Sequence, residues 1–356
     1  MTWQSFTKTL IVSTVALVAG LFLFVLLVDP YDSLWFSPPL DRAPASQNQR
    51  YSYPALARDP QFDSLVIGNS TVAMLRPDKL NQALGGRFVN LSINDGIAIE
   101  QARMLDLFAR HHPRIETAIF GIDMAWCQVE ADYRRVGIWP FPHWLYDADP
   151  WNDLVNLFDL PAIENAGRQL AITTGLLPPV YHRDGYNPFL PPPEQYDLAR
   201  VRDKIYGAAG PRVRTPVVPA VEVSEAELAA WTFAAHALMA DMLTALPEAT
   251  RKVLLVVPYH RFFQPLPGSR AAVRYRECKQ RLANLAASVP NSMVVDFMIP
   301  SEITSHDENY WDDRHYTRAV ADRIVDLIAG ALQGRRSIPG LFEIAQPDPA
   351  LTAAQR

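Results

Sequence analysis

Cysteine is almost absent from this chain of 356 residues, which contains only Cys127 and Cys278. No Cys-x-x-Cys pair and no other spacing typical of metal ligands is present, so we expect neither a metal nor a cofactor. Two cysteines this far apart form a disulfide in an oxidising compartment or remain partly buried thiols. The sequence leaves both alternatives open.

Dense runs of lysine or arginine are also lacking. The formal net charge is −5 and the pI is about 5.9, so we do not expect nucleic-acid binding. Glycine is scarcer than proline (16 against 30 residues), which favours stiff connecting segments over flexible linkers. With 49% apolar residues, the chain is long enough for one large or two modest globular domains.

One long apolar run is present. Residues 10–28 are interrupted by only one glycine and two hydroxyl residues, and a helix of this length, at ~1.5 Å per residue, matches the hydrocarbon core of a bilayer. Lys8 precedes the run and Asp29 follows it, which predicts a cytoplasmic N-terminus and an external body. No small-x-small cleavage site precedes Pro30, so we favour an uncleaved anchor over a signal peptide.

The rest of the chain divides by composition. We expect an anchor over residues 1–30, a juxtamembrane stalk over 31–62, an α/β domain over 63–335 and a loosely ordered tail over 336–356. Residues 126–222, rich in proline and aromatics, are too long for a plain loop and predict an inserted lid or substrate-facing subdomain.

Apolar strand patterns alternate with helical ones through the α/β domain. The expected strands are residues 65–67, 87–92, 117–123, 252–258 and 293–297, and the expected helices are residues 72–84, 97–111, 153–173, 224–246, 270–287 and 316–332. Ser224, followed by Glu227, predicts a capping box. This alternation predicts a parallel sheet of about five strands with helices on both faces.

The stretch that organises the domain ends at Ser70. The apolar strand over residues 65–67 stops at Gly68, and a serine two residues later lies at the carboxyl edge of the predicted sheet. Open α/β sheets bind their ligands at that edge. Ser70 is therefore a candidate nucleophile, which needs a base, an orienting acid and oxyanion donors from elsewhere in the chain.

A histidine near the end of the chain is the candidate base. His315 precedes the last predicted helix, and Asp312 lies three residues before it. A carboxylate at this spacing can accept a hydrogen bond from the imidazole and fix its tautomer, although Asp313 is a rival for the same role. His260 and Arg261 follow the strand over residues 252–258; substrate contact and a structural role are both open for them. Asn94, after the second predicted strand, is a further candidate for substrate contact.

Two motifs resemble the first and last signature blocks of the SGNH/GDSL hydrolases: Gly68-Asn69-Ser70 and Asp312-x-x-His315. The resemblance extends over roughly residues 63–333, apart from the long insertion. It implies a flavodoxin-like α/β fold and a triad in which Ser70 is the nucleophile, His315 the base and Asp312 the orienting acid.

The resemblance also implies an oxyanion hole. Gly96, after the second predicted strand, and Asp123, after the third, fall where the family places an oxyanion glycine and an oxyanion asparagine, so the hole would comprise Ser70, Gly96 and Asp123. An ionised carboxylate repels a developing oxyanion. Asp123 therefore points elsewhere, or the backbone N–H groups of Ser70 and Gly96 form the hole, alone or with Asn94, or catalysis is weak.

Membrane-anchored members of this kind include the SGNH-like proteins of alginate O-acetylation and the D-alanyl-transfer proteins of cell-wall polymers. The resemblance implies a single-pass protein of the bacterial inner membrane with a periplasmic serine acyltransferase or esterase domain. Its partners would be a glycan or acylated envelope polymer and a membrane-bound acyltransferase. The alternative is a catalytically weak or inactive factor that binds one of these partners. Hydrolysis and transfer share their first half, and the sequence does not distinguish them.

Overall fold

The computed structural model describes residues 2–129 and 139–348. The chain divides into two compact units, one of Met1–Ala57 with Pro140–Arg183 and the other of Arg58–Trp139 with Asp184–Arg356. The expected insertion over residues 126–222 is therefore divided between the units: its residues 140–183 belong to the first unit, together with most of the expected stalk, and the rest belongs to the second. Residues 130–138 and 349–356 lie outside the described part.

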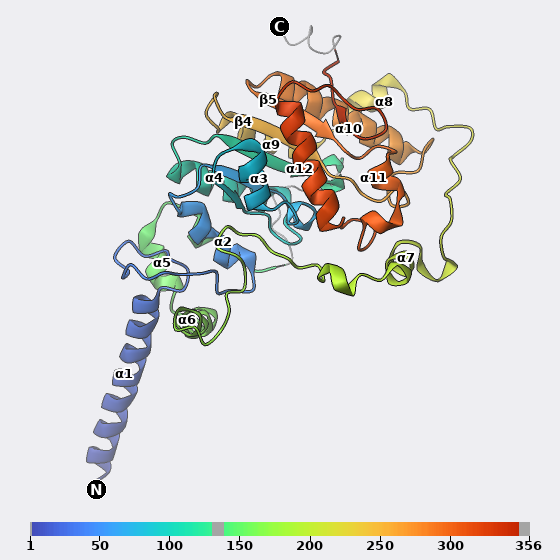
Figure 1. The fold of residues 1–356 in the computed structure, drawn as a ribbon. Coiled ribbons are helices and arrows are strands. Elements are labelled where there is room, and N and C mark those ends of the chain that lie inside the picture. Colours follow the sequence, from blue (N-terminus) through green and yellow to red (C-terminus); the bar gives the residue numbers. More distant parts are fainter. Residues whose placement is uncertain (1, 130–138, 349–356) are drawn as a thin grey trace. The chain divides into compact units, whose positions relative to one another are not determined.

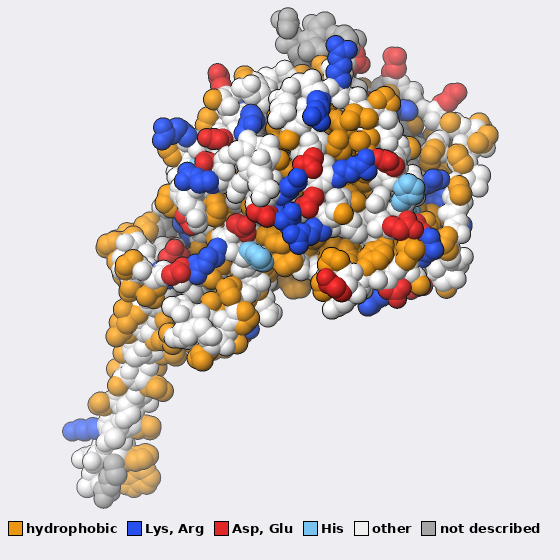
Figure 2. Space-filling model, in the orientation of Figure 1, with side chains coloured by type: hydrophobic (Ala, Val, Ile, Leu, Met, Phe, Trp, Pro, Cys, Tyr) orange, Lys and Arg blue, Asp and Glu red, His pale blue; other side chains and the backbone are white. Residues whose placement is uncertain are grey.

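The first unit begins with helix α1 (Trp3–Val28), which confirms the expected apolar helix. Thr2 caps its N-terminus, and Asp29, in the left-handed conformation, ends it. Within this helix only Val25 and Val28 are buried, and Figure 2 shows hydrophobic side chains along its length. The helix is long and apolar enough to cross a membrane.

Buried aromatic contacts hold the expected stalk to residues 140–183. The Tyr146 hydroxyl donates to the Arg50 carbonyl (2.9 Å), and Tyr53 packs edge-on against Tyr181. Besides α1, the helices here are α2 (Gln49–Arg58), α5 (Pro150–Asn156) and α6 (Leu160–Thr173).

The single helix expected over residues 153–173 is divided. Asp159 accepts a hydrogen bond from the Ala162 N–H and caps α6, with Pro161 in its first turn, so a new helix starts where continuation would cost a backbone hydrogen bond. α6 packs beside α1, where the rings of Phe22 and Phe158 meet edge to face at 4.5 Å.

The second unit is built on a sheet of six strands in the order β2-β1-β3-β4-β5-β6. The strands are β1 (Ser64–Ile67), β2 (Phe88–Asn90), β3 (Thr117–Ile122), β4 (Arg251–Val256), β5 (Ser292–Asp296) and β6 (Glu343–Ile344). The five predicted strands are confirmed as parallel neighbours. β6 pairs antiparallel with β5 and corrects the expectation of a loose tail, because Phe342 is buried and stacks on Phe297.

Helices flank the sheet on both faces, as expected. The helices of this unit are α3 (Pro77–Leu84), α4 (Ala98–His111), α7 (Leu198–Tyr206), α8 (Glu225–Ala230), α9 (Ala234–Thr244), α10 (Arg270–Ala287), α11 (Glu302–Ser305) and α12 (Arg318–Leu332). α3 packs with α12, and α4 packs with α9 (Figure 1). Because the chain reverses its direction across the sheet at β2, right-handed crossovers place α3 and α4 on opposite faces. The carboxyl ends of β1 and β3 therefore border a topological switch point.

Two predicted helices in this unit are interrupted. The helix expected over residues 72–84 is a 3₁₀ turn, η1 (Ser70–Val72), followed by α3, because Pro77 occupies the first helical turn, where its missing N–H costs nothing. The helix expected over 224–246 is α8 and α9, divided by an extended segment at Trp231. Ser224 caps α8, but the Glu227 carboxylate pairs with Arg270.

A disulfide joins Cys127 and Cys278 across 151 residues, with their Cα atoms 5.5 Å apart. Cys127 ends η2 (Met124–Cys127), and Cys278 lies on α10. Of the two alternatives that the sequence left open, the structure contains the disulfide. A cross-link of this kind persists in an oxidising compartment.

We predict that replacing both Cys127 and Cys278 by serine lowers the free energy of unfolding by about 2–4 kcal/mol, because a long closed loop restricts the unfolded chain. Denaturant unfolding with and without reductant measures the change. Reductant should destabilise the wild type and leave the double variant unchanged. Alkylation of two thiols in the denatured, unreduced wild type would contradict the cross-link.

Candidate active site

Ser70 lies on a turn that two glycines allow to approach the sheet. After β1, a Cβ atom added at Gly68 would lie 2.4 Å from Val72 Cγ2, and one added at Gly121 in β3 would lie 2.7 Å from Val72 Cγ1. Val72 thus occupies the space that larger residues would fill. Asn69 caps the turn by accepting the Thr71 N–H (3.1 Å), and Ser70 is held at the carboxyl edge, beside the switch point.

The structure brings together the three residues expected to form a triad. Ser70 Oγ lies 2.9 Å from His315 Nε2, and His315 Nδ1 lies 2.8 Å from Asp312 Oδ2. Asp312 Oδ1 also accepts the backbone N–H of His315 at 2.8 Å. Asp313, the rival orienting acid, pairs instead with Arg314 at 3.3 Å. Asp312 is therefore the carboxylate that contacts the imidazole.

Asp312 is poised to remain ionised. Burial alone raises the pKa of this carboxyl, but the hydrogen bond and charge of His315 and the N–H groups of Arg314 and His315 lower the pKa to about 2. An ionised Asp312 accepts a proton-bearing Nδ1, which leaves the His315 Nε2 lone pair toward the Ser70 hydroxyl. This is the tautomer that a general base requires.

Asp123 does not point toward a substrate oxygen. Its Oδ1 accepts the Ala125 N–H at 3.0 Å, and its Oδ2 accepts a hydrogen bond from the Asn69 side-chain amide. Burial raises the pKa of Asp123, and the hydrogen bonds from Asn69 and the backbone oppose that rise. Of the alternatives left open by the sequence, the structure supports the one in which Asp123 points elsewhere: it holds the residue that precedes Ser70.

The Gly96 N–H, expected in the oxyanion hole, closes a turn instead. It donates to the Ile93 carbonyl at 2.8 Å, and a Cβ at position 96 would lie 2.7 Å from that same oxygen. Asn94 is half-buried in this loop after β2. The Ser70 N–H occupies the first position of η1, where a helix leaves its backbone donor without an internal acceptor. Of the donors expected in the oxyanion hole, the Ser70 N–H is therefore the one that the geometry of its turn leaves available.

His260 is buried and has its partners outside the triad. Its side chain is fully buried, with Nε2 3.2 Å from Asp307 Oδ1 and Nδ1 accepting the Phe262 N–H at 3.2 Å. Burial lowers the pKa of His260, and the neighbouring Asp307 carboxylate opposes this. Of the two alternatives that the sequence left open for His260, its burial and its contact with Asp307 favour the structural role.

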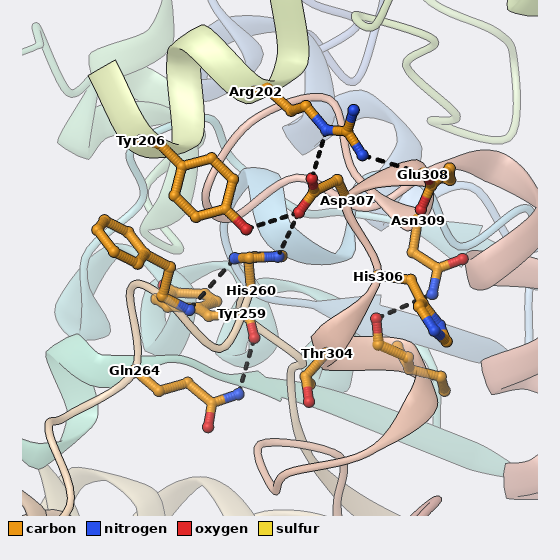
Figure 3. Close-up of polar contacts among 12 residues, drawn as sticks. Arg202, Tyr206, Tyr259, His260, Gln264, Thr304, His306, Asp307, Glu308 and Asn309 are labelled. Atoms are coloured by element: carbon orange, nitrogen blue, oxygen red, sulfur yellow. Dashed lines mark hydrogen bonds and ion pairs between the residues drawn. The ribbon is translucent and has the colours of Figure 1, made fainter. Parts of the chain in front are cut away.

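Asp307 ties an inserted helix to the loop that carries the histidine. It accepts hydrogen bonds from Arg202 Nε and from the Tyr206 hydroxyl, each at 2.7 Å (Figure 3). Both donors lie on α7. A second contact holds the same loop: the backbone N–H of His260 donates to the backbone carbonyl of Asp313 at 3.0 Å. These contacts fix the loop over residues 307–316 at its first residue, Asp307, and at Asp313.

Phe189 is a neighbour of the triad that the sequence did not identify. Its ring meets the His315 ring edge-on, with centroids 5.2 Å apart. The residues on either side of it, Pro188 and Leu190, line a cavity of about 650 Å³ that also contacts Met74 and Trp311. The only feature of the sequence that pointed to Phe189 is the abundance of aromatics and prolines in the insertion. That composition does not indicate which aromatic ring contacts the histidine.

Arg261 is exposed and lines a different cavity, of about 560 Å³. Within residues 2–129 and 139–348, no group of three or more His, Cys, Asp or Glu side chains is placed to hold a metal ion. No protein-family model matches the chain, and no curated protein is significantly similar to it.

We predict that Asp312→Asn removes a pH-dependent contribution to stability. The pKa of the native carboxyl, about 2, lies below its ordinary value near 4, so the contribution is complete above about pH 4 and is lost as the pH falls toward 2. The free-energy difference between wild type and variant should shrink by about 2 kcal/mol over that range, as measured by urea unfolding. A difference that does not change with pH would contradict the assignment; Asp313→Asn is the adjacent control.

We predict that Asp307→Asn destabilises the protein by about 1–3 kcal/mol, because Arg202 Nε and the Tyr206 hydroxyl lose a charged acceptor. Glu308→Gln is the matched control: Glu308 is exposed and 3.7 Å from the same arginine, Arg202, so we expect a change of less than about 0.5 kcal/mol. Equal effects of the two substitutions on the free energy of unfolding would exclude the anchoring role of Asp307.

Proposed function

We propose that this protein is a membrane-anchored serine acyltransferase or esterase of the SGNH type, which acts on O-acyl groups of an envelope polysaccharide or related polymer. The observation that carries the proposal is the continuous contact from Ser70 Oγ through His315 to Asp312, at 2.9 and 2.8 Å. The strand order 2-1-3-4-5 of the parallel part of the sheet, which is that of flavodoxin-like folds, also supports it.

The geometry suits a two-step acyl transfer. Ser70 Oγ attacks the carbonyl carbon of an ester while its proton passes to His315 Nε2, and Asp312 stabilises the resulting imidazolium. The Ser70 N–H donates to the oxyanion. As the tetrahedral intermediate collapses, the departing alcohol takes the proton from His315, leaving an acyl ester on Ser70.

The second half of the reaction regenerates the serine. Water or a glycan hydroxyl loses its proton to His315 Nε2 and attacks the acyl carbon, and Ser70 Oγ leaves with that proton. Water yields a free acid, and a glycan hydroxyl yields an O-acylated glycan. The aromatic ring of Phe189 lies beside His315, where it would cover part of the base against water and so favour transfer.

The first unit supports an address at a membrane. Helix α1 is accompanied within this unit by exposed apolar side chains, among them Trp35, Trp151 and Leu160 at 70%, 65% and 80% exposure. Tryptophan is enriched where proteins meet the lipid headgroups. We infer a single-pass protein of the bacterial inner membrane with a cytoplasmic N-terminus; the disulfide supports a periplasmic catalytic domain. A membrane-bound acyltransferase that supplies the acyl group would be a suitable partner.

One observation favours a second candidate, a factor that binds a glycan or an acyltransferase without efficient catalysis. Asp123 is bonded to Asn69, and the Gly96 N–H to Ile93, so two of the three groups expected in the oxyanion hole have other partners. One missing donor costs about 10²–10³ in rate. A slow enzyme would retain the fold and the triad contacts.

We predict that a fluorophosphonate probe labels Ser70 in the full-length protein, because His315 removes the hydroxyl proton during attack. Ser70→Ala and His315→Ala should abolish labelling, and Asp312→Asn should reduce its rate by at least about tenfold. Peptide mass spectrometry locates the adduct. Ser288→Ala, at an exposed serine after α10, is the matched control and should label normally.

The same variants separate the two candidates. Release of p-nitrophenol from p-nitrophenyl acetate reports acylation, and mass spectrometry of an added oligosaccharide distinguishes transfer from hydrolysis. If the wild type is not labelled, or Ser70→Ala is labelled equally, Ser70 is no nucleophile and the binding factor becomes the better proposal.

A further inference from the structure

A second cavity in the α/β unit is lined by cations. It has a volume of about 560 Å³ and lies between residues 211–216 of the insertion and residues 261–267, which follow β4. Three arginines line it, Arg212, Arg214 and Arg261, and no aspartate or glutamate does. A cavity of this volume can hold a small ligand or one to two sugar units of a larger one.

Two of the guanidinium groups are held in place by neutral partners. Arg212 Nη1 donates to the carbonyls of Tyr206 and Gly210 at 2.8 and 3.1 Å. Arg214 Nη1 donates to the carbonyls of Phe262 and Gln264 at 2.7 and 2.8 Å. Their guanidinium carbons lie 4.9 and 5.8 Å from the centroid of the Phe262 ring. Carbonyls and a ring orient these side chains, and the positive charges remain.

None of the three arginines forms an ion pair with any residue in the described part of the chain. Arg202, by comparison, pairs with both Asp307 and Glu308. Three cations around one cavity repel one another in a protein whose net charge is −5, and an anion removes that repulsion. Guanidinium groups match carboxylate and phosphate oxygens in geometry as well as charge.

We propose that this cavity is an anion-binding site in which Arg212, Arg214 and Arg261 hold a carboxylate or phosphate group, with the body of the ligand against Phe262 and the neighbouring prolines. The chemistry is that of an acidic or phosphorylated sugar unit. Sequence reasoning singled out Arg261 alone; its two partners come from the insertion.

The cavity adjoins the structure that supports the triad. Tyr206 lines the cavity and also donates to Asp307, while the Arg314 guanidinium, next to His315, lies 5.3 Å from the Phe263 ring. An anion seated there would lie at the same edge of the sheet as Ser70. Its role as part of the substrate rests on the proposed function, but its binding does not require Ser70 chemistry.

The test measures binding of three probes to the full-length protein in detergent micelles by isothermal titration. Hexagalacturonate presents carboxylates, glucose 6-phosphate presents a phosphate, and maltohexaose is the neutral control. We expect at least one charged probe to bind more tightly than maltohexaose. Its affinity should fall as the salt concentration rises from about 50 to about 500 mM, because salt screens the attraction between the anion and the arginines over this range. Ser70→Ala should bind that probe like the wild type.

Substitutions assign the binding to the cavity. Arg261→Gln should weaken the charged probe roughly tenfold or more, the effect of losing one charge-assisted contact, and Arg261→Lys should restore part of the affinity. Arg276→Gln, at an exposed arginine of α10, is the matched control for net charge and should have no effect. If glucose 6-phosphate is the only probe whose binding depends on Arg261, the anion is a phosphate. If hexagalacturonate is the only such probe, the anion is a carboxylate.

Two results would overturn the site: equal affinity for maltohexaose and both charged probes, or equal affinities of Arg261→Gln and Arg276→Gln. Because Ser70→Ala is included, loss of anion binding and loss of serine reactivity are observed separately. An unreactive Ser70 with intact anion binding would leave this site in place and remove only the proposed chemistry.

Discussion

The hydrogen bond between Ser70 and His315 joins two loops that lie 245 residues apart in the chain. Most of the second unit serves to bring these loops to one edge of the sheet. β1 delivers Ser70 to the switch point, and the loop after β5 delivers His315 just before α12. Parallel strands make this possible because their carboxyl ends meet at a common edge, where side chains from distant segments converge.

The hydrogen bond between Ser70 and His315 depends on the position of the Ser70 turn relative to the sheet. Gly68 and Gly121 leave room for Val72 between β1 and β3, and the Asp123 carboxylate holds Asn69 through its side-chain amide. In this chain, therefore, the acidic residue after β3 positions the turn that carries Ser70. Both carboxylate oxygens of Asp123 are engaged in these contacts, so the group is not free to oppose the chemistry proposed at Ser70.

The loop over residues 307–316, which carries His315, is held in place by contacts with the insertion. Asp307 receives Arg202 and Tyr206 from α7 and faces the buried His260, so the second half of the insertion contributes to the framework of the site. The same segment supplies Phe189 to the triad and two arginines to the cationic cavity. The partners of Asp307, the ring beside His315 and two arginines of the cationic cavity thus come from one stretch of chain, and changes in it would alter all three together.

The sequence by itself determined the long apolar helix near the N-terminus, the five parallel strands, the bounds of α10, and the pairing of Ser70 with a histidine and aspartate near the end of the domain. These follow from local patterns: apolar runs, periodicity, and residues that directly follow strands. Only the tertiary structure decided which partner each polar group takes. It directed Asp123 to Asn69, buried His260 against Asp307, recruited β6 from the tail through Phe342 and gathered three arginines around one cavity. These outcomes depend on which distant segments the folded chain places side by side, and no local pattern contains that information.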